Sequence, residues 1–439
     1  MPKTLVSDSL PLIGFFPLFY NLAETGRAVL VAKRYIELGG KAIFFSHGGE
    51  YEKLAKDIGC KVVRVNPIYS DDFIDDLWKY SRLEKIGPPF SEEVLKEHVT
   101  AESKAYSQTD VKLIVTTNNF PCSLSARVAK VPLISITPKV IGKFIKYPDD
   151  AEFLLTRVIP KKLKLAVLNW LFPRNKTWIH PFVKLAKYYN LQGYQNSLEL
   201  NTGDYTFYTD FLEILNLSKS EIKPTDYYIG PIFMDELFGK TASDKRADDE
   251  INKHLQKSGR SILFSLGSSG TPELFINILK ALSKTSYNVI AVYSSILCED
   301  KLPVVNDNII LRRFVPSIKE LNQKVDLVII HGGQGTVYTA AYAGKPVIGF
   351  PMQFEQHLNL EMLVKHGMAR IESRRYFKEE VFLKAIEDVF NNYEIYLKNA
   401  KTLASNLPKP QGVTNATRNI MEIIKQRDLN QLTEKGIAK

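Results

Sequence analysis

Short runs of β-branched and aromatic residues alternate along the chain with longer stretches whose apolar positions recur at helical spacing. In the first part of the chain, strands are expected at 12–16, 42–46, 62–65, 112–116, 133–137 and 205–209. A second series is expected at 261–266, 288–292, 309–314, 327–330 and 346–350. Strands that alternate with helices form parallel sheets with helical crossover connections. The pattern therefore predicts an α/β fold with two similar halves.

A charged stretch with few apolar residues separates the two series of strands. It spans 240–250, and we interpret it as an exposed linker. We therefore expect a first domain at 1–238 and a second domain at 239–412. A final amphipathic helix with its tail, at 413–439, is expected to pack back on the first domain.

The composition is that of an ordinary globular protein, because 45% of the 439 residues are hydrophobic and 24% are charged. The three cysteines match no zinc spacing and leave one thiol over in any disulfide scheme. The apolar run at 10–20 contains two prolines and is too short to span a bilayer. It also lacks the basic start and the small-residue cleavage site of a signal peptide. We therefore expect a reduced, cytoplasmic protein.

The net charge of +10 is concentrated in one segment. Between 153 and 198 the chain holds eight Lys and Arg residues, eight aromatic residues and no Asp or Glu. Cations beside tryptophan at this density are typical of an element that lies on an anionic membrane surface. The alternative is a basic, solvated lid over a substrate site. No nucleic-acid-binding motif accompanies the charge, so nucleic acid is not an expected partner.

The clearest motif follows the apolar strand at 327–330, where the chain continues as His331-Gly332-Gly333-Gln334-Gly335-Thr336. A buried strand, a glycine-rich turn and a helix start bring backbone N–H groups and the positive helix end together, which favours a bound phosphate. Glycine allows the backbone to approach a ligand closely. His331 is placed at the carboxyl end of the strand, where open sheets bind ligands. The alternative is a tight turn with a packed histidine.

This motif and its continuation resemble the nucleotide-sugar-dependent glycosyltransferases of GT-B fold, in the family 1 and UDP-glucuronosyl/glucosyltransferase group. The family signature has a His-x-Gly turn, a small Ser or Thr at the next helix start, an Ala-Gly-x-Pro strand entry and an acidic-Gln pair. Here these elements are 331–336, Ala343-Gly344-Lys345-Pro346 and Glu355-Gln356. Their order and spacing continue over about 90 residues.

The resemblance implies two Rossmann-like domains that face each other across a cleft, with the donor in the second domain. By the same resemblance, the diphosphate would be held by Gly267, Ser268, Ser269, His331, Gly333, Gly335 and Thr336. Phe314 would stack on the nucleobase, with Val315 beside it in the base-binding loop. Glu355 and Gln356 would hydrogen-bond hydroxyls of the donor sugar.

Two positions depart from the family pattern. The glutamate that usually binds the ribose falls at Thr339, and the glutamine of the base-binding loop falls at Ser317. A carboxylate that grips both ribose hydroxyls is therefore missing. Both UDP-sugars and the deoxyribose-containing dTDP-sugars stay open as donors.

The general base is a further departure. In the family, a histidine after the first strand deprotonates the acceptor hydroxyl, whereas this chain has Glu24 at that position and Arg27 where relatives have Pro or Arg. We hypothesise that Glu24 is the base, because a carboxylate in a dry setting can accept a hydroxyl proton. The alternative is a surface glutamate at a helix start, where the helix dipole favours it.

His47 is a second candidate for the base, since it follows the second strand at its carboxyl end. A lone histidine more often has a structural role. The family pairs its histidine with an aspartate at the end of a later strand, which would fall at 116–119. That stretch holds no carboxylate, so a His-Asp dyad is not expected.

The implied reaction is transfer of a hexose-type sugar from a UDP- or dTDP-sugar to a hydroxyl of a lipid or other hydrophobic acceptor. The chain has no Asp-x-Asp triplet, which metal-dependent sugar transferases of the other main fold use to hold a cation. We therefore expect a metal-independent reaction without a resident cofactor. Two alternatives remain: a nucleotide-sugar epimerase on the same fold, and a non-catalytic protein that binds a nucleotide-sugar or lipid.

Overall fold

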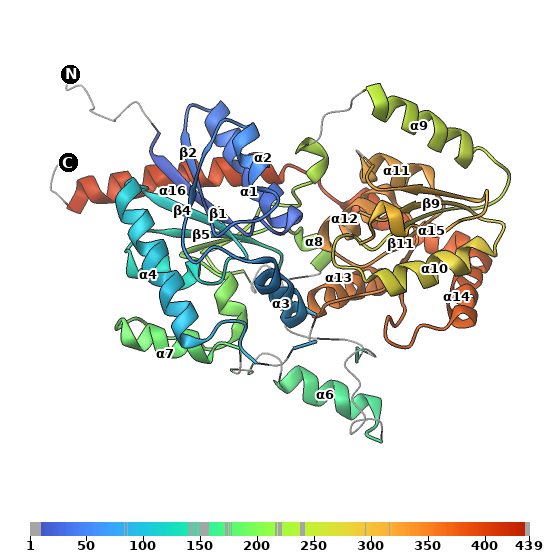
Figure 1. Ribbon diagram of the computed structural model, residues 1–439, viewed down its shortest axis with the longest axis horizontal. Helices are drawn as coiled ribbons and strands as arrows, with labels where there is room; N and C mark the ends of the chain where they lie inside the picture. Colours follow the sequence, from blue (N-terminus) through green and yellow to red (C-terminus); the bar gives the residue numbers. More distant parts are fainter. Residues whose placement is uncertain are drawn as a thin grey trace.

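The computed structural model consists of two α/β halves that lie side by side (Figure 1). It describes residues 10–82, 84–85, 87–139, 144, 147–148, 158–171, 174, 176, 178–215, 217, 222–237, 242–294, 296–315 and 317–434. The first half contains the amino-terminal strands and the second contains the carboxyl-terminal ones.

The first half is built on a parallel sheet that has seven strands within the described residues, in the order β3-β2-β1-β4-β5-β6-β7. Its strands are β1 (Leu12–Pro17), β2 (Lys41–Ser46), β3 (Lys61–Arg64), β4 (Leu113–Thr117), β5 (Leu133–Thr137), β6 (Tyr205–Tyr208) and β7 (Asp226–Tyr228). Its helices are α1 (Leu22–Glu37), α2 (Glu52–Asp57), α3 (Asp71–Ser81), α4 (Glu92–Thr109), α5 (Cys122–Val128), α6 (Lys161–Leu171), α7 (His180–Tyr188) and α8 (Leu212–Leu215).

The second half repeats this topology with a parallel sheet in the order β10-β9-β8-β11-β12-β13. Its strands are β8 (Ser261–Ser265), β9 (Asn288–Val292), β10 (Ile309–Arg312), β11 (Leu327–Ile330), β12 (Val347–Gly349) and β13 (Ala369–Ile371). The helices that follow β7 are α9 (Ala242–Leu255), α10 (Pro272–Ser283), α11 (Ile318–Lys324), α12 (Gln334–Ala343), α13 (Phe354–Lys365), α14 (Glu379–Asn391), α15 (Tyr393–Asn406) and α16 (Gly412–Glu434).

The strand order indicates where each sheet is expected to bind a ligand. It reverses beside the first strand of each half, because β1 lies between β2 and β4, and β8 lies between β9 and β11. Open parallel sheets bind ligands outside the carboxyl ends of the strands at such a point. Residues that follow β1, β4, β8 and β11 line one shared cavity, so the two reversal points face each other.

The predicted α/β pattern agrees with the observed order, with two differences. The short edge strands β7 and β13 were not predicted, since three residues carry too little periodicity to be recognised. The stretch at 240–250, which we interpret as an exposed linker, is helical from Ala242, where α9 begins. Its Ala, Lys, Arg and Glu residues favour a helix even though the exposed face is charged. The boundary predicted at 238 falls outside the described residues.

The last helix, α16, belongs to the first half in space. It packs against α1, and its side chains Ala416, Ile420 and Ile423 are buried in the core around β1 and β4. Figure 1 shows this helix, in red, running across the blue half of the molecule. The chain therefore passes from the first half to the second and back again.

Candidate functional site

A cavity of about 290 Å³ lies between the two halves. We call its first-half side the first wall, which includes Tyr20, Glu24, Arg27, Trp78, Phe90, Asn118 and Trp178. We call its second-half side the second wall, which consists of Ser268, Ser269, His331, Gly333, Gln334, Gln353, Glu355 and Gln356. The cavity thus brings Glu24 together with six of the residues predicted to bind the donor.

His331 lies at the carboxyl end of β11, with its ring held between two glycine turns. A Cβ atom on Gly267 would be 2.5 Å from the ring Cε1 atom, and one on Gly333 would be 2.4 Å from Nε2. Burial lowers the pKa of His331 to about 4, although a hydrogen bond with the Ser265 backbone opposes the shift. Its Nδ1 atom has no hydrogen-bond partner within the described residues. The imidazole is therefore neutral near pH 7, and its buried Nδ1 atom is left unpaired by the described residues.

Helix α12 begins directly after this turn. The hydroxyl of Thr336 donates a hydrogen bond to the carbonyl oxygen of Gly333 at 2.8 Å and fixes the first helical turn. The first N–H groups of a helix lack intrahelical partners and carry the positive end of its dipole. A Cβ atom on Gly335 would meet no atom within 4 Å, so the space at this position is open. The helix start can therefore bind an anion.

Gln356 is hydrogen bonded within the protein. Its Nε2 atom donates to the Ser269 hydroxyl at 3.0 Å, and its Oε1 atom accepts from the backbone N–H of Met352 at 2.8 Å. The side chain is buried. It therefore ties the turn after β8 to the start of α13, and its predicted contact with a sugar stays a prediction.

Glu355 reaches the cavity from the first turn of α13. Its Oε1 atom accepts a hydrogen bond of 2.6 Å from the Asn359 side chain. Burial raises the pKa of Glu355 to about 7, and the charges of Glu24 and Asp210 act in the same direction. Arg27 and the bond from Asn359 oppose the shift. The carboxyl group is therefore partly protonated near neutral pH.

Glu24 faces the cavity from the first turn of α1. Both carboxylate oxygens lie 2.9 Å from Nη1 of Arg27, and Oε1 also accepts a 2.8 Å hydrogen bond from the Asn118 side chain. Glu24 and Arg27 are each only 5% exposed. The alternative of a solvated glutamate at a helix start is therefore wrong. Asn118 follows β4, within 116–119, where the family would have a carboxylate.

Gln334 connects the two halves. It is not among the site residues predicted from the sequence. Its Oε1 atom accepts from Arg27 at 3.2 Å and from the Thr209 hydroxyl at 2.7 Å. Its Nε2 atom donates to the carbonyl oxygen of Thr209 at 2.9 Å and to Asp210 at 2.8 Å. All four hydrogen-bonding positions of the amide are thus occupied. In the sequence, the only indication of this contact is the polar pair Thr209-Asp210, which directly follows β6.

His47 lies outside this cavity, which does not support it as a base. Its Nε2 atom is 2.9 Å from Glu102, its Nδ1 atom is 2.9 Å from the carbonyl oxygen of Val65, and its ring stacks on Tyr69 at 4.9 Å. The side chain is 3% exposed. Both ring nitrogens are engaged inside the first half, so nothing in this geometry favours His47 as the base.

The predicted base-binding loop also lies outside the cavity. Phe314 is 49% exposed, and its stacking on a nucleobase stays a prediction. The side chain of Val315 is buried in a core formed mainly by the second half. Only its backbone is therefore left to contact a nucleotide. Thr339 donates a hydrogen bond to Thr336 within its own helix and contributes no carboxylate.

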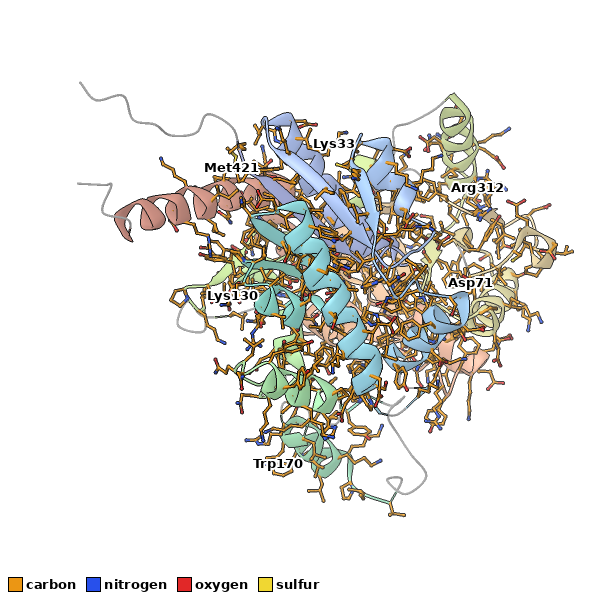
Figure 2. The ribbon with its side chains drawn as sticks, turned by 60° about the vertical axis from the view of Figure 1, so that its left-hand side comes forward. Lys33, Asp71, Lys130, Trp170, Arg312 and Met421 are labelled. Atoms are coloured by element: carbon orange, nitrogen blue, oxygen red, sulfur yellow. The ribbon has the colours of Figure 1, made fainter. Side chains whose placement is uncertain are left out.

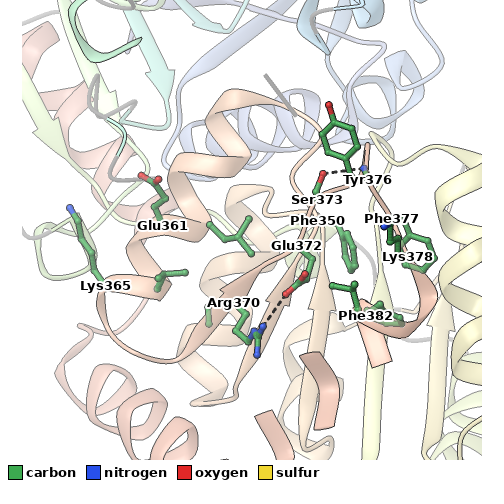
Figure 3. A pocket seen from close by; sticks show the side chains of 14 residues that line it. Phe350, Glu361, Lys365, Arg370, Glu372, Ser373, Tyr376, Phe377, Lys378 and Phe382 are labelled. Atoms are coloured by element: carbon green, nitrogen blue, oxygen red, sulfur yellow. Dashed lines mark hydrogen bonds and ion pairs between the residues drawn. The ribbon is translucent and has the colours of Figure 1, made fainter. Parts of the chain in front are cut away.

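A larger cavity, of about 620 Å³, lies beside the edge strand β13. Its apolar lining includes Phe350, Phe377 and Phe382, as Figure 3 shows. None of the residues predicted for the site lines it. Size alone therefore does not identify the functional cavity.

Comparison with known proteins supports the same assignment. Residues 262–415 match the model of the glycosyltransferase family 28 C-terminal domain. The chain is 26% identical over 333 residues to a PGL/p-HBAD biosynthesis glycosyltransferase of Mycobacterium tuberculosis, which covers 72% of this chain and 71% of the relative. It is 23% identical over 398 residues to a PGL/p-HBAD biosynthesis rhamnosyltransferase of Mycobacterium bovis, and this match covers 86% of this chain and 81% of the relative.

The chain is a nucleotide-sugar-dependent glycosyltransferase. Its fold is GT-B, which confirms the predicted resemblance, and the matching domain model is that of family 28. The solved structure of the spinosyn rhamnosyltransferase SpnG with thymidine diphosphate has the same fold, with a TM-score of 0.58, 12% identity, and coverage of 92% of this chain and 99% of that one. Among the described residues of the glycosyltransferase, no helix is long and apolar enough to cross a bilayer.

Proposed function

We propose that the glycosyltransferase moves a hexose-type sugar from a dTDP- or UDP-sugar to a hydroxyl group of a lipid or other hydrophobic acceptor. The observation that carries this proposal is the shared cavity, in which an anion-binding helix start faces a buried carboxylate. Aromatic side chains on the first wall, such as Tyr20, Trp78 and Phe120, provide an apolar surface for the acceptor.

The second wall is proposed to hold the diphosphate of the donor. Backbone N–H groups at the start of α12 and the neutral ring of His331 can donate hydrogen bonds to phosphate oxygens. Preorganised donors stabilise the negative charge that develops on the leaving group, by about 2.7–4 kcal/mol for one well-placed group. This stabilisation would act without a metal ion.

Glu24 is proposed as the general base. The acceptor hydroxyl would give its proton to the Glu24 carboxylate while its oxygen forms a bond to the anomeric carbon of the sugar. The bond between that carbon and the diphosphate oxygen breaks, and its electron pair leaves with the nucleotide. Arg27 and Asn118 hold the carboxylate in place through three hydrogen bonds.

A dTDP-sugar is the donor that we favour. Thr339 stands where the family has its ribose-binding carboxylate, so this chain has one contact fewer with a 2′-hydroxyl group. A curated relative is named as a rhamnosyltransferase, and a solved structure of the same fold holds thymidine diphosphate. These names support a dTDP-linked deoxyhexose without fixing the sugar.

The test combines donor binding with product analysis. Thermal unfolding of the protein would be compared with UDP, dTDP, GDP and their sugars at matched ionic strength, because a ligand at 100 times its dissociation constant adds about 2.7 kcal/mol of stability. The stabilising donor would then be incubated with lipid extracts, and glycosylated products would be measured by mass spectrometry. An isomerised nucleotide-sugar without acceptor would favour an epimerase. Binding without any turnover would contradict the proposed transfer.

A further inference from the structure

Helix α6 exposes four large apolar side chains to solvent. Leu163, Val167, Trp170 and Leu171 are 55%, 47%, 59% and 49% exposed. Their spacing of four, three and one residues places them on one stripe, about 100° wide, along the helix. We call these four residues the α6 stripe. Figure 1 shows α6 projecting from the body of the molecule, away from both sheets.

Polar side chains of the same helix face inward. The side chain of Asn169 accepts a 2.6 Å hydrogen bond from the backbone N–H of Phe144 and donates one of 2.8 Å to its carbonyl oxygen. Lys164 is only 5% exposed, with its ammonium group 5.5 Å from the centre of the Tyr147 ring. The orientation of α6 is therefore fixed by specific contacts. Leu165 and Leu168 are partly buried, so apolar residues lie on the inner face as well as on the exposed one, whereas an ordinary surface helix exposes mainly polar residues.

The stretch of sequence that contains the α6 stripe is basic, although Lys184 on α7 pairs with Glu92 of α4 at 2.6 Å. No Asp or Glu occurs between 153 and 198, and the exposed cations of the described part of this segment are Lys161, Lys162, Arg174, Lys176, Lys184 and Lys187. Arg174 lies 5.4 Å from the centre of the Trp170 ring and donates to the Trp170 carbonyl oxygen at 2.9 Å. An apolar stripe edged by tryptophan and cations matches the interface of an anionic bilayer.

The α6 stripe lies close to the first wall of the cavity. Trp178, seven residues after the end of α6, lines that wall. Seven residues of chain span at most about 25 Å, so Leu171, at the carboxyl end of the stripe, lies within that distance of Trp178. Figure 2 shows Trp170 at an outer end of the molecule, far from the strands.

We propose that α6 docks the glycosyltransferase on an anionic lipid bilayer, with the α6 stripe inserted at the boundary between headgroups and acyl chains. Docking would bring the first wall close to the membrane surface, so that a lipid acceptor could enter without leaving the bilayer. The docking itself is independent of the proposed chemistry, whereas the lipid entry rests on the proposed function.

The test is binding of the full-length protein to vesicles. Wild-type protein is expected to sediment with vesicles of phosphatidylcholine and phosphatidylglycerol, less with phosphatidylcholine alone, and less at high salt. The double variant Val167→Glu/Trp170→Glu should bind the mixed vesicles at least about tenfold more weakly, because two inserted apolar groups become charged. Both positions are exposed, so folding should be unaffected.

A matched control changes two exposed apolar residues of the second half. Val381→Glu/Ile395→Glu removes side chains that are 52% and 62% exposed and should leave vesicle binding unchanged. A second readout is quenching of tryptophan fluorescence by brominated lipids, which should fall in Trp170→Phe. Equal binding of wild type and Val167→Glu/Trp170→Glu, or no binding of wild type to mixed vesicles, would overturn the proposal.

Two further measurements separate the alternatives. If Val167→Glu/Trp170→Glu abolished self-association in sedimentation velocity and vesicle binding were absent, the stripe would be an interface between copies, and membrane docking would be rejected. Donor-induced thermal stabilisation should be the same in wild type and in the double variant. Its loss in both proteins would count against the proposed function while leaving the vesicle result valid.

Discussion

The two walls of the cleft are built in different ways. The second wall consists mainly of turns and the start of a helix, in which one short segment, 331–336, supplies the glycines, the histidine and the free N–H groups. The first wall depends on side chains from separate elements, since Glu24 and Arg27 come from α1 and Asn118 follows β4. The proposed binding of a diphosphate thus depends on a local segment of the chain, whereas the proposed transfer of the acceptor proton requires tertiary structure.

We therefore expect the second wall to be more sensitive to an added methyl group on the backbone, and the first wall to the loss of one functional group. The ring of His331 leaves no room for a methyl group at Gly267 or Gly333. At Glu24, a change that keeps the shape of the side chain still removes the basic oxygen. The following experiments test this contrast.

The largest effect is expected for Glu24→Gln. The amide keeps an acceptor for Arg27 and Asn118, so folding and donor binding should be retained, while kcat should fall by about 10²–10⁴-fold because a positioned base is lost. Transfer kinetics with a saturating donor would measure this. Glu37→Gln, on the exposed end of the same helix, is the control and should keep full activity. Near-normal turnover in Glu24→Gln would assign the base elsewhere.

A pair of glycine variants tests the second wall. Gly335→Ala places its methyl group in space that the protein leaves open, so the variant should be as stable as wild type, or more stable by about 0.4–1 kcal/mol, through lower entropy of the unfolded chain. The same methyl group should obstruct the diphosphate and weaken donor binding about tenfold, measured by calorimetry. Gly333→Ala, which meets His331 at 2.4 Å, should instead lower the melting temperature. Unchanged donor affinity in Gly335→Ala would contradict the assigned phosphate position.

The smallest effect is a change in the pH dependence of stability. The pKa of Glu355 is raised to about 7 in the folded protein, so its protonated form is favoured there more than in the unfolded chain. The resulting stability is fully present below the unfolded pKa and is lost as the pH rises through 7. Glu355→Gln should therefore show a shallower decrease in melting temperature between about pH 4.5 and pH 7 than wild type. Parallel profiles for the two proteins would contradict the raised pKa.

The sequence predicts most of the fold and the second wall, because both depend on local patterns. Strand periodicity identified β1 and β11, and the turn at 331–336 carried the functional signature by itself. The first wall was only partly predictable. Glu24 could be placed by its register, but the bonds that Asn118 and Arg27 make to it depend on how β4 and α1 pack. The bridge through Gln334 could not be predicted, since its partner Thr209 lies 125 residues away.

The placement of α16 has a consequence for dissecting the enzyme into fragments. A polypeptide that ends near residue 237 would lack the helix that packs against α1, so apolar side chains of the core that Ile420 and Ile423 complete would be left open to water. The complementary piece would carry the same helix without its docking surface. Neither piece is a self-sufficient unit, and the two should recover solubility only when they are co-expressed. A circular permutant that joins α16 directly to the start of β1 would keep the first half as one continuous stretch of chain.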